Sequence, residues 1–355
     1  MNKGLWVVLC ALIDLSACTG ILMKGVDGSF VTGRTVEFGV DLDLSVAVVP
    51  RNMQFTSHVM GKKGKSYTSK YAVVGAYCFK DQVIMDGMNE KGLVAAAFYF
   101  QDYAGYSNID STNQEFAVSP VEFPHWILTQ FASIEEVLSG LNSVVIAPQI
   151  AKDWGSAPAP FHYIVYDRLG KSLVIEPVDG VLVVYENPLG VITNSPGFDW
   201  HLQNLINYIN IKPQTAMPVE IRGLKLTPFG QGSGGQGMPG DFTPPSRFVR
   251  ATFFSVNSLV TKTNQELINQ SFHVLNQFDI PLGTVSGQVE GKIHYDHTMF
   301  TSVKNPNDLK YYYKSYDNQV VKFIDLNKFD LNAKTIVSQR VQGNTTYEDV
   351  SNQLK

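Results

Sequence analysis

Short apolar segments separated by turn residues dominate this chain and predict many β-strands. Residues 21–24 and 29–33 flank Asp27-Gly28, a dipeptide typical of tight hairpin turns. Later apolar runs repeat this pattern around Gly, Asn and Asp. Further strands are predicted at residues 83–85 and 93–100 (around a turn at 89–92), 163–166, 173–176, 181–185, 311–316 and 320–326.

Helices are predicted where the spacing of apolar residues lengthens to three or four. Ser133 with Glu136, and Thr263 with Glu266, form capping-box patterns that mark the start of a helix. Apolar faces follow both caps, and a third such face has no capping box. The faces comprise Ile134, Val137, Leu138 and Leu141; Leu202, Leu205, Ile206 and Ile209; and Leu267, Ile268, Val274 and Leu275.

The order of strands, helix, strands, helices and strands favours α+β layers over alternating βαβ units. No internal repeat and no linker divides the chain. The longest irregular stretch, residues 230–245, is rich in Gly and Pro. We interpret it as a functional loop within a single domain.

Composition and charge exclude several classes of protein. The 355 residues are 44% hydrophobic and 17% charged, which argues against intrinsic disorder. Lys and Arg number 28 against 32 Asp and Glu, so the net charge of −4 lacks the basic field that nucleic-acid binding requires. Three cysteines are too few for a disulfide-built scaffold. We expect no nucleic-acid partner.

The first 17 residues have the pattern of an export signal. An apolar run at 5–13, too short to span a bilayer, is followed by the small residues Ser16 and Ala17. Their removal would leave one domain, residues 18–355, starting at Cys18. We expect an exported protein, periplasmic or secreted, with no stable membrane insertion after processing.

An N-terminal Cys18 would hold a thiol and a free α-amine in one residue. The amine's ordinary pKa of about 7.7–8.0 would let it act as base for its own side chain, and the thiolate is the nucleophile. Two alternatives stay open. Residues 15–18 also fit a bacterial lipoprotein signal, which would place a lipid on Cys18, and the start of the chain could instead be a buried strand or helix.

Such a nucleophile needs a cation, a carboxylate and an oxyanion donor. Arg34, on the strand that returns beside Cys18, could favour the thiolate, and Glu37 could hold the amine. The side-chain amide of Asn194 could donate to the oxyanion of a tetrahedral intermediate. Taken singly, Arg34 is more often a surface strand residue, Glu37 its solvated neighbour, and Asn194 before Ser-Pro a turn residue.

Motifs that carry this chemistry occur in order along the chain. They are Cys18-Thr19-Gly20, Gly33-Arg34-Thr35, Glu37-Phe38, residues 86–93, Thr193-Asn194-Ser195-Pro196 with residues 198–201, residues 240–241 with 245–250, and residues 298–302 with 311–316. Together they resemble the choloylglycine hydrolase family of N-terminal nucleophile hydrolases, which includes conjugated bile acid hydrolases and penicillin V acylases. The resemblance covers nearly the whole chain after residue 17.

This resemblance implies a four-layer αββα sandwich, often assembled as a homotetramer. It implies Cys18 as nucleophile, Arg34 as stabiliser of the thiolate, and the residue 37 carboxylate as the group that orients the amine. It also implies Asn194 in the oxyanion hole and Arg247 in the active-site network. The implied substrates are small-molecule amides such as conjugated bile acids, penicillin V or long-chain N-acyl compounds, with no cofactor.

The chain departs from the family pattern at two positions. Glu37 stands where well-known members have Asp. Tyr99 stands where bile salt hydrolases commonly have Asn, and penicillin V acylases resemble this chain at that position. The backbone N–H of Tyr99 could still serve the oxyanion hole, so this change bears on substrate choice. Two alternatives to an active amidase stay open: a non-catalytic lipid-anchored envelope protein, or a site spoiled by Glu37.

Other patterns carry little weight. Gly230, Gly232 and Gly235 fit G-x-G-x-x-G but do not lead into a helix, and Gly64-Lys65-Ser66 lacks the first glycine of a phosphate loop. His294 and His297 form a pair without further ligands, so we expect no metal. Cys78 is expected to be a small buried hydrophobe.

Overall fold

The computed structural model describes residues 16–79, 82–150, 157–289, 291–341 and 343–354. The predicted leader therefore lies outside the described residues, apart from Ser16 and Ala17 at the start of the first strand. Within these ranges, no helix has both the length and the apolar composition needed to cross a bilayer.

Two antiparallel sheets form the centre of the molecule. In the described chain the larger has eight strands in the spatial order β13 (Val181–Glu186), β12 (Ser172–Val178), β11 (Phe161–Tyr166), β8 (Val94–Tyr99), β7 (Asp86–Asn89), β6 (Val73–Tyr77), β3 (Ser45–Val49) and β20 (Val337–Arg340). The smaller has the order β1 (Ser16–Lys24), β2 (Phe30–Phe38), β17 (Lys292–Asn305), β18 (Lys310–Ser315) and β19 (Lys322–Asp325), with β16 (Val285–Val289) paired to β17.

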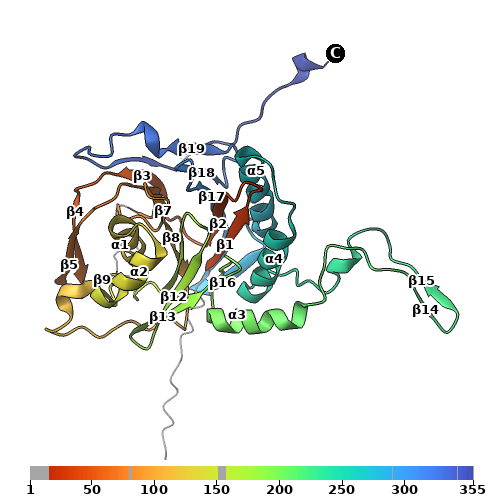
Figure 1. Ribbon diagram of the computed structural model, residues 1–355, viewed down its shortest axis with the longest axis horizontal. Coiled ribbons are helices and arrows are strands. Elements are labelled where there is room, and N and C mark those ends of the chain that lie inside the picture. The colour runs from red at the N-terminus through yellow and green to blue at the C-terminus, as the bar shows by residue number, and fades with distance from the viewer. Residues whose placement is uncertain (1–15, 80–81, 151–156, 290, 342, 355) are drawn as a thin grey trace, which may run out of the picture.

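Helices cover the outer faces of both sheets, which gives four layers (Figure 1). α1 (Phe123–Gln130) packs on β7 and β8 of the larger sheet and is followed by α2 (Ile134–Gly140). α4 (Pro244–Asn257) and α5 (Asn264–Leu275) pack on β1 and β2 of the smaller sheet, and α3 (Phe198–Leu205) lies against α4. The predicted α+β class and its αββα sandwich are confirmed.

Burial on both faces explains the long apolar runs in the sequence. Every residue of β3, β6, β8 and β11 is buried. Strands covered on both sides lose the alternation of polar and apolar residues that a half-exposed strand shows. By contrast, the edge strand β13 is exposed or half-buried along its whole length.

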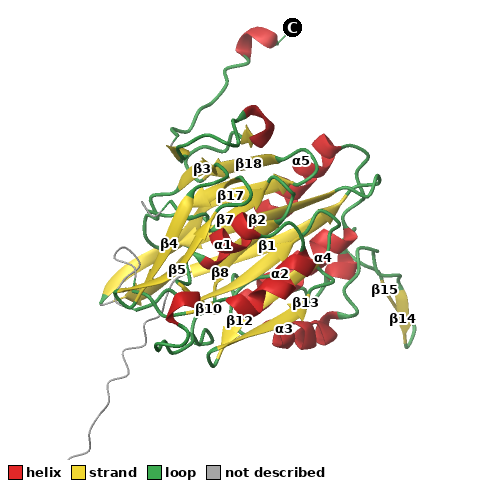
Figure 2. Cartoon of the chain, turned by 60° about the vertical axis from the view of Figure 1, so that its left-hand side comes forward, coloured by secondary structure: helices red, strands yellow, loops and turns green. Residues whose placement is uncertain are grey.

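Among the residues that the structure describes, three two-stranded ribbons lie outside the main sheets. They are β4 (Gln54–Val59) with β5 (Lys62–Thr68), β9 (Ala117–Val118) with β10 (Val145–Ile146), and β14 (Val219–Ile221) with β15 (Leu224–Leu226). The last belongs to residues 212–240, which we call the arm. Figures 1 and 2 show the arm extending away from the body of the molecule.

Most predicted elements are present. The hairpin around Asp27-Gly28 is β1 and β2, and the three-stranded meander is β11, β12 and β13. Thr263 and Glu266 form a complete capping box. At α2 the cap is partial, since Ser133 accepts from the Glu136 N–H while the Glu136 carboxylate accepts from the Ala132 N–H.

Three predictions are wrong in detail. The strand predicted at 83–85 lies instead at Asp86–Asn89, where the residues pair with β6 and β8; of the predicted residues, Met85 hydrogen-bonds to Ala76 and Ala97 just before this strand begins. Ile206 and Ile209 are exposed rather than on an inner face, since α3 ends at Leu205 and a 3₁₀ turn follows. Helix α4 begins inside the stretch predicted as irregular.

Candidate active site

The site is built around Cys18, near the start of the edge strand β1. Cys18 lies opposite Val36 of β2 and is only 6% exposed. Two residues on, Gly20 exchanges backbone hydrogen bonds with Ile192 at 2.8 and 3.1 Å, which brings the segment after Ile192 against β1. A Cβ at Gly20 would lie 2.7 Å from the Ile192 side chain, so this approach requires glycine.

Arg34 contacts the thiol from the neighbouring strand. Its Nη2 lies 3.1 Å from Cys18 Sγ, while Nη1 donates to the Ala97 carbonyl of the opposite sheet at 2.8 Å. The guanidinium also lies 4.2 Å from the centre of the Phe98 ring. Burial raises the pKa of the Cys18 thiol, and Arg34 is the largest influence in the opposite direction.

Asn194 and Arg247 hold the backbone of Cys18. The Cys18 nitrogen, here joined to Ala17, donates to Asn194 Oδ1 at 2.9 Å, and Arg247 Nη2 donates to the same oxygen at 2.8 Å. Arg247 Nη1 donates to the Cys18 carbonyl at 2.5 Å. The other end of the Asn194 amide, Nδ2, donates to the Tyr99 carbonyl at 2.8 Å. An amide nitrogen has two hydrogens, so one remains for a substrate oxygen.

Glu37 lies in the same region but is not joined to the Cys18 nitrogen. In the described chain its Oε1 accepts from Thr298 Oγ1 at 3.1 Å, and the residue pairs across the strands with Ala17. Burial raises the pKa of Glu37 to about 8, against the influence of Arg247. At neutral pH this carboxyl is therefore largely protonated while Cys18 is part of a peptide bond.

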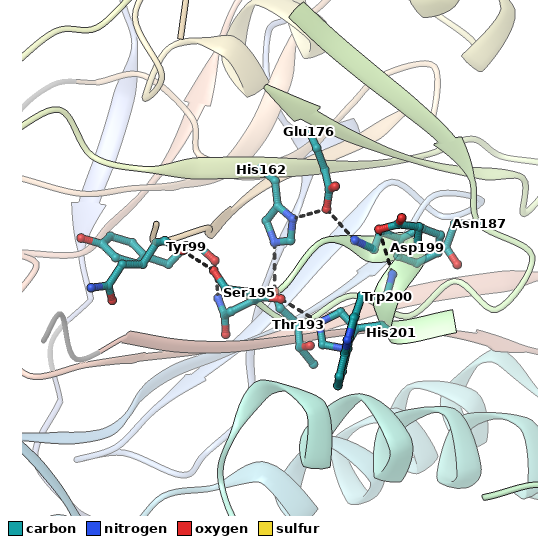
Figure 3. A network of polar contacts seen from close by, with 12 residues as sticks. Tyr99, His162, Glu176, Asn187, Thr193, Ser195, Asp199, Trp200 and His201 are labelled. Carbon is teal, nitrogen blue, oxygen red and sulfur yellow. Dashed lines mark hydrogen bonds and ion pairs between the residues drawn. The ribbon is translucent and has the colours of Figure 1, made fainter. Parts of the chain in front are cut away.

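The segment that carries Asn194 is held by a buried pair, His162 of β11 and Glu176 of β12 (Figure 3). The two residues are joined by His162 Nδ1 and Glu176 Oε1 at 3.1 Å. His162 Nε2 lies 3.2 Å from the Thr193 carbonyl, and Glu176 Oε1 also accepts from the Phe198 N–H at 3.0 Å. The pair thereby fixes both ends of residues 193–198.

Two further contacts fix the middle of that segment (Figure 3). His201 of α3 places Nε2 2.9 Å from the Asn194 carbonyl, and Ser195 Oγ donates to the Gln101 carbonyl at 2.6 Å. Burial lowers the pKa of His201 to about 4, so at neutral pH the ring is uncharged and Nε2 donates as a neutral N–H. These four contacts hold residues 193–198, which carry the Asn194 side chain to its own partners at Cys18, Arg247 and Tyr99.

A cavity of about 520 Å³, its open mouth included, lies beside Cys18. The Tyr99 ring packs edge-on against Phe38 and Phe161, with ring centres 6.0 and 5.8 Å apart. The lining is mainly apolar and consists of Cys18, Arg34, Val36, Glu37, Phe38, Leu42, Leu44, Ala76, Cys78, Met85, Asp86, Ala97, Tyr99, Phe161 and Phe300. Such a cavity suits an apolar acyl group next to a nucleophile.

Sequence reasoning missed several buried polar groups of the site. Asp296 is buried beside Arg247, and burial raises its pKa to about 7. Lys304 and the pair His162 and Glu176 also went unnoticed as functional groups. A signal was available for His162 and Glu176, because each is a titratable residue within a strand that is otherwise largely apolar. Strand β17, which carries Asp296 and Lys304, is rich in polar residues and gave no such signal.

Cys78 is buried, as predicted. In the ranges the structure describes, no group of three or more His, Cys, Asp or Glu side chains could hold a metal ion, so His294 and His297 gain no partners there. Gly230, Gly232 and Gly235 lie in the arm.

Comparisons with known proteins point to one family. The model of the linear amide C–N hydrolases, choloylglycine hydrolase family, matches residues 18–339. The chain is 34% identical over 324 residues to a bile salt hydrolase/transferase of Clostridium perfringens, covering 90% of this chain and 95% of that protein. It is 31% identical over 336 residues to a bile salt hydrolase/transferase of Lactiplantibacillus plantarum, covering 94% and 100%.

Solved structures agree. A mutant conjugated bile acid hydrolase from Clostridium perfringens has a TM-score of 0.83 at 31% identity, covering 94% of this chain and all of that one. A penicillin V acylase from Agrobacterium tumefaciens has a TM-score of 0.73 at 24% identity, covering 90% of each chain, and supports the fold alone.

Proposed function

The chain belongs to the choloylglycine hydrolase family of linear amide C–N hydrolases, and from this premise we propose that the processed protein uses Cys18 as an N-terminal nucleophile. It is an amide-bond hydrolase by family, while the nucleophile and the substrate are the proposal. The observation that carries it is the convergence on one buried residue of Arg34 at the thiol, 3.1 Å away, and Asn194 at the nitrogen, 2.9 Å away.

In the proposed reaction the Cys18 thiolate attacks the carbonyl carbon of a linear amide. The free α-amine takes the thiol proton and passes it to the leaving nitrogen, the C–N bond breaks, and an acyl thioester forms. Water then attacks the thioester, and the acid and the thiol are released. The second hydrogen on Asn194 Nδ2 would donate to the oxyanion.

Loss of residues 1–17 is a necessary part of this proposal. While Ala17 is attached, the Cys18 nitrogen is an amide and cannot act as a base. Once it is an amine, its positive charge would lower the pKa of Glu37, which lies in β2 opposite Ala17, the residue next to Cys18 in β1. Glu37 would then be the carboxylate that orients the amine. We propose export to the periplasm or outside the cell as the setting for this removal.

The apolar cavity and Tyr99 favour an aryl or fatty acyl group in the amide. Asn194 Nδ2 donates to the backbone carbonyl of Tyr99, while the tyrosine ring lines the cavity, so the identity of this side chain bears on the acyl site rather than on that hydrogen bond. Conjugated bile acids, penicillin V and related N-acyl compounds are the substrates to compare. The relatives named as bile salt hydrolases support the first of these classes.

The test is a two-substrate assay of the purified protein on glycocholate and penicillin V, after sequencing of its N-terminus. We expect Cys18 as the first residue, release of acid and amine in equal amounts, and background turnover in Cys18→Ala. Unchanged turnover by Cys18→Ala, or turnover by protein that retains residues 1–17, would overturn the proposal. A lipid on Cys18, detected as added intact mass, would support the anchored envelope protein instead.

We also propose that the protein assembles as a homotetramer through its arm. The arm carries apolar side chains that are exposed in the single chain, and Phe229 is fully exposed. A contiguous set of this kind on a projecting segment is typical of a contact with another protein surface. The exposed residues are Met217, Val219, Ile221, Leu224, Leu226 and Phe229.

A further inference from the structure

A buried ion pair between Lys304 and Asp86 joins the two sheets near Arg34. The proposed mechanism does not use it. Lys304 of β17 is 2% exposed and Asp86 of β7 is 3% exposed. Lys304 Nζ binds Asp86 Oδ1 and also donates to Ser302 Oγ at 2.9 Å. Asp86 Oδ2 accepts from Ser302 Oγ at 2.8 Å and from the Tyr311 hydroxyl at 2.6 Å.

A fully buried lysine has a high energetic cost, so its presence here needs a physical reason. Burial lowers the pKa of Lys304 to about 8, although Asp86 acts in the opposite direction. Burial would raise the pKa of Asp86, but Lys304 and then Arg34 bring it below its usual value. Asp86 is thus shared between two cations, Lys304 and Arg34.

Arg34 is likewise shared between two anions. Asp86 and Cys18 line the same cavity as Arg34, and both interact electrostatically with the guanidinium. Without Lys304, Asp86 would have Arg34 as its remaining cation and would compete with the Cys18 thiolate for it. With Lys304 present, two cations face one carboxylate, and one positive charge is left for the sulfur.

We propose that Lys304 is a positioning residue that holds Asp86 and so keeps the Arg34 charge available to the Cys18 thiolate. The inference rests on the proposed function only in taking Cys18 as the nucleophile. Two other charged groups face Cys18, Glu37 from β2 and Arg247 from α4. Lys304 hydrogen-bonds to neither, since its partners are Asp86 and Ser302.

The test measures the thiol directly. The rate of Cys18 alkylation by iodoacetamide is followed from pH 5 to 10 by peptide mass spectrometry, which separates Cys18 from Cys78. In Lys304→Met we expect the profile to move to higher pH and the rate at pH 7 to fall about tenfold, as for a thiol pKa about one unit higher. Lys314→Met, which removes another buried lysine of the same sheet, should leave the profile unchanged.

The double variant Asp86→Asn/Lys304→Met separates charge from packing. It removes the competing carboxylate, so alkylation should return to within about twofold of the original rate, whereas a merely structural role would make the double variant worse than Lys304→Met. If Lys304→Met does not fold, Lys304→Gln keeps a donor for Asp86 without the charge and should show the same shift. A folded variant with an unshifted profile, or a double variant no faster than the single one, would overturn the inference.

This readout does not depend on amide hydrolysis. A shifted profile in protein that cleaves neither glycocholate nor penicillin V would support the role of Lys304 and count against those substrates. Turnover that depends on Cys18, together with an unshifted pH profile of alkylation in Lys304→Met, would support the proposed function and contradict the proposed role of Lys304.

Discussion

At the scale of single residues, burial sets the charge state of each group around Cys18. Burial raises the pKa of the Cys18 thiol, and it also raises the pKa of the Glu37 carboxyl to about 8. Arg34 opposes the first effect and Arg247 the second. These pKa values belong to the chain in which the Cys18 nitrogen is part of a peptide bond. A free amine at Cys18 would add a positive charge to the site and change them.

Glu37 gives a pH-dependent stability that can be measured on the full-length chain. Because its folded pKa of about 8 lies above the ordinary value of 4.5, folding favours the protonated carboxyl. That contribution is complete below about pH 4.5 and is lost as pH rises to about 8. Glu37→Gln cannot ionise and does not share this loss. The free energy of unfolding of the variant, relative to that of the original protein, should therefore rise by a few kcal/mol between these two pH values.

Urea unfolding at pH 4, 6 and 8.5 checks this prediction. A difference between the two proteins that is constant with pH would show that Glu37 keeps an ordinary pKa in the folded chain.

Exchange of Glu37 for Asp tests whether the longer side chain has impaired the site. The Glu37 carboxylate reaches Thr298 Oγ1 at 3.1 Å, a contact that a side chain shorter by one methylene would lengthen or lose. We therefore expect Glu37→Asp to change kcat on the preferred amide by less than about tenfold, in either direction. A sharp gain in kcat would mean that the site of this chain is impaired.

At the scale of elements, the position of Asn194 depends on strands β11 and β12 and on helix α3. His162 and Glu176 hold the ends of residues 193–198, and His201 holds the Asn194 carbonyl. Precision at Cys18 thus comes from residues with no direct contact to it. This is the usual relation between an active-site group and the hydrogen bonds that support it.

Removal of the Glu176 carboxylate should loosen this segment. Glu176→Ala leaves the buried Phe198 N–H without its acceptor, at a cost of about 1–3 kcal/mol in stability. We expect kcat to fall about tenfold with little change in KM, because the oxyanion donor loses its alignment. Glu176→Gln keeps an acceptor oxygen and should recover most of kcat, while Cys18 alkylation stays the same in both. Equal loss in the two variants would contradict a positioning role.

The sequence predicted elements best where the apolar pattern was periodic. The caps at Ser133 and Thr263 located α2 and α5 correctly. Helix α1 was missed because residues 123–129 are buried on every side, so no face stands out. Helix α4 was missed because its buried face includes Ser246, Arg247 and Arg250, which conceals an apolar stripe.

For the site, the order of the motifs indicated the family and, through the resemblance, pointed to Asn194 and Arg247 as well as Cys18, but it could not reveal which atoms of these distant residues meet. Asn194 is 176 positions from Cys18, and Arg247 is 229 away. The bond from Glu37 to Thr298 and the ion pair of Asp86 with Lys304 link strands from opposite ends of the chain. Their pairing depends on sheet register, which no local pattern in the sequence specifies.

At the scale of the whole molecule, the four layers protect the site while the arm projects away from them. The predicted family is confirmed by the match over residues 18–339, and the predicted fold by the similarity to solved structures. The arm contributes little to the core, since both strands of its ribbon are exposed along their length. Its exposed apolar residues are the surface on which the proposed assembly would depend.

Introducing negative charge on the arm tests the proposed assembly. The variant Ile221→Asp/Leu224→Asp places two carboxylates on the apolar ribbon and should convert a tetramer to smaller species, seen by light scattering. The monomer's fold should survive, with thermal unfolding of the body changed by no more than about 0.5 kcal/mol per site, because both positions are exposed. A parent chain that is monomeric, or a variant that stays tetrameric, would contradict the proposal.

The pairing of Ser16 and Ala17 with β2 bears on the timing of maturation. In the folded chain the bond between Ala17 and Cys18 lies inside a hydrogen-bonded strand, and both residues are buried. A peptidase that binds its substrate as an extended segment cannot reach that bond without first peeling the strand away. If residues 1–17 are removed as proposed, trimming by an external enzyme would have to precede completion of the sheet, whereas a cut made by the chain on itself could follow it.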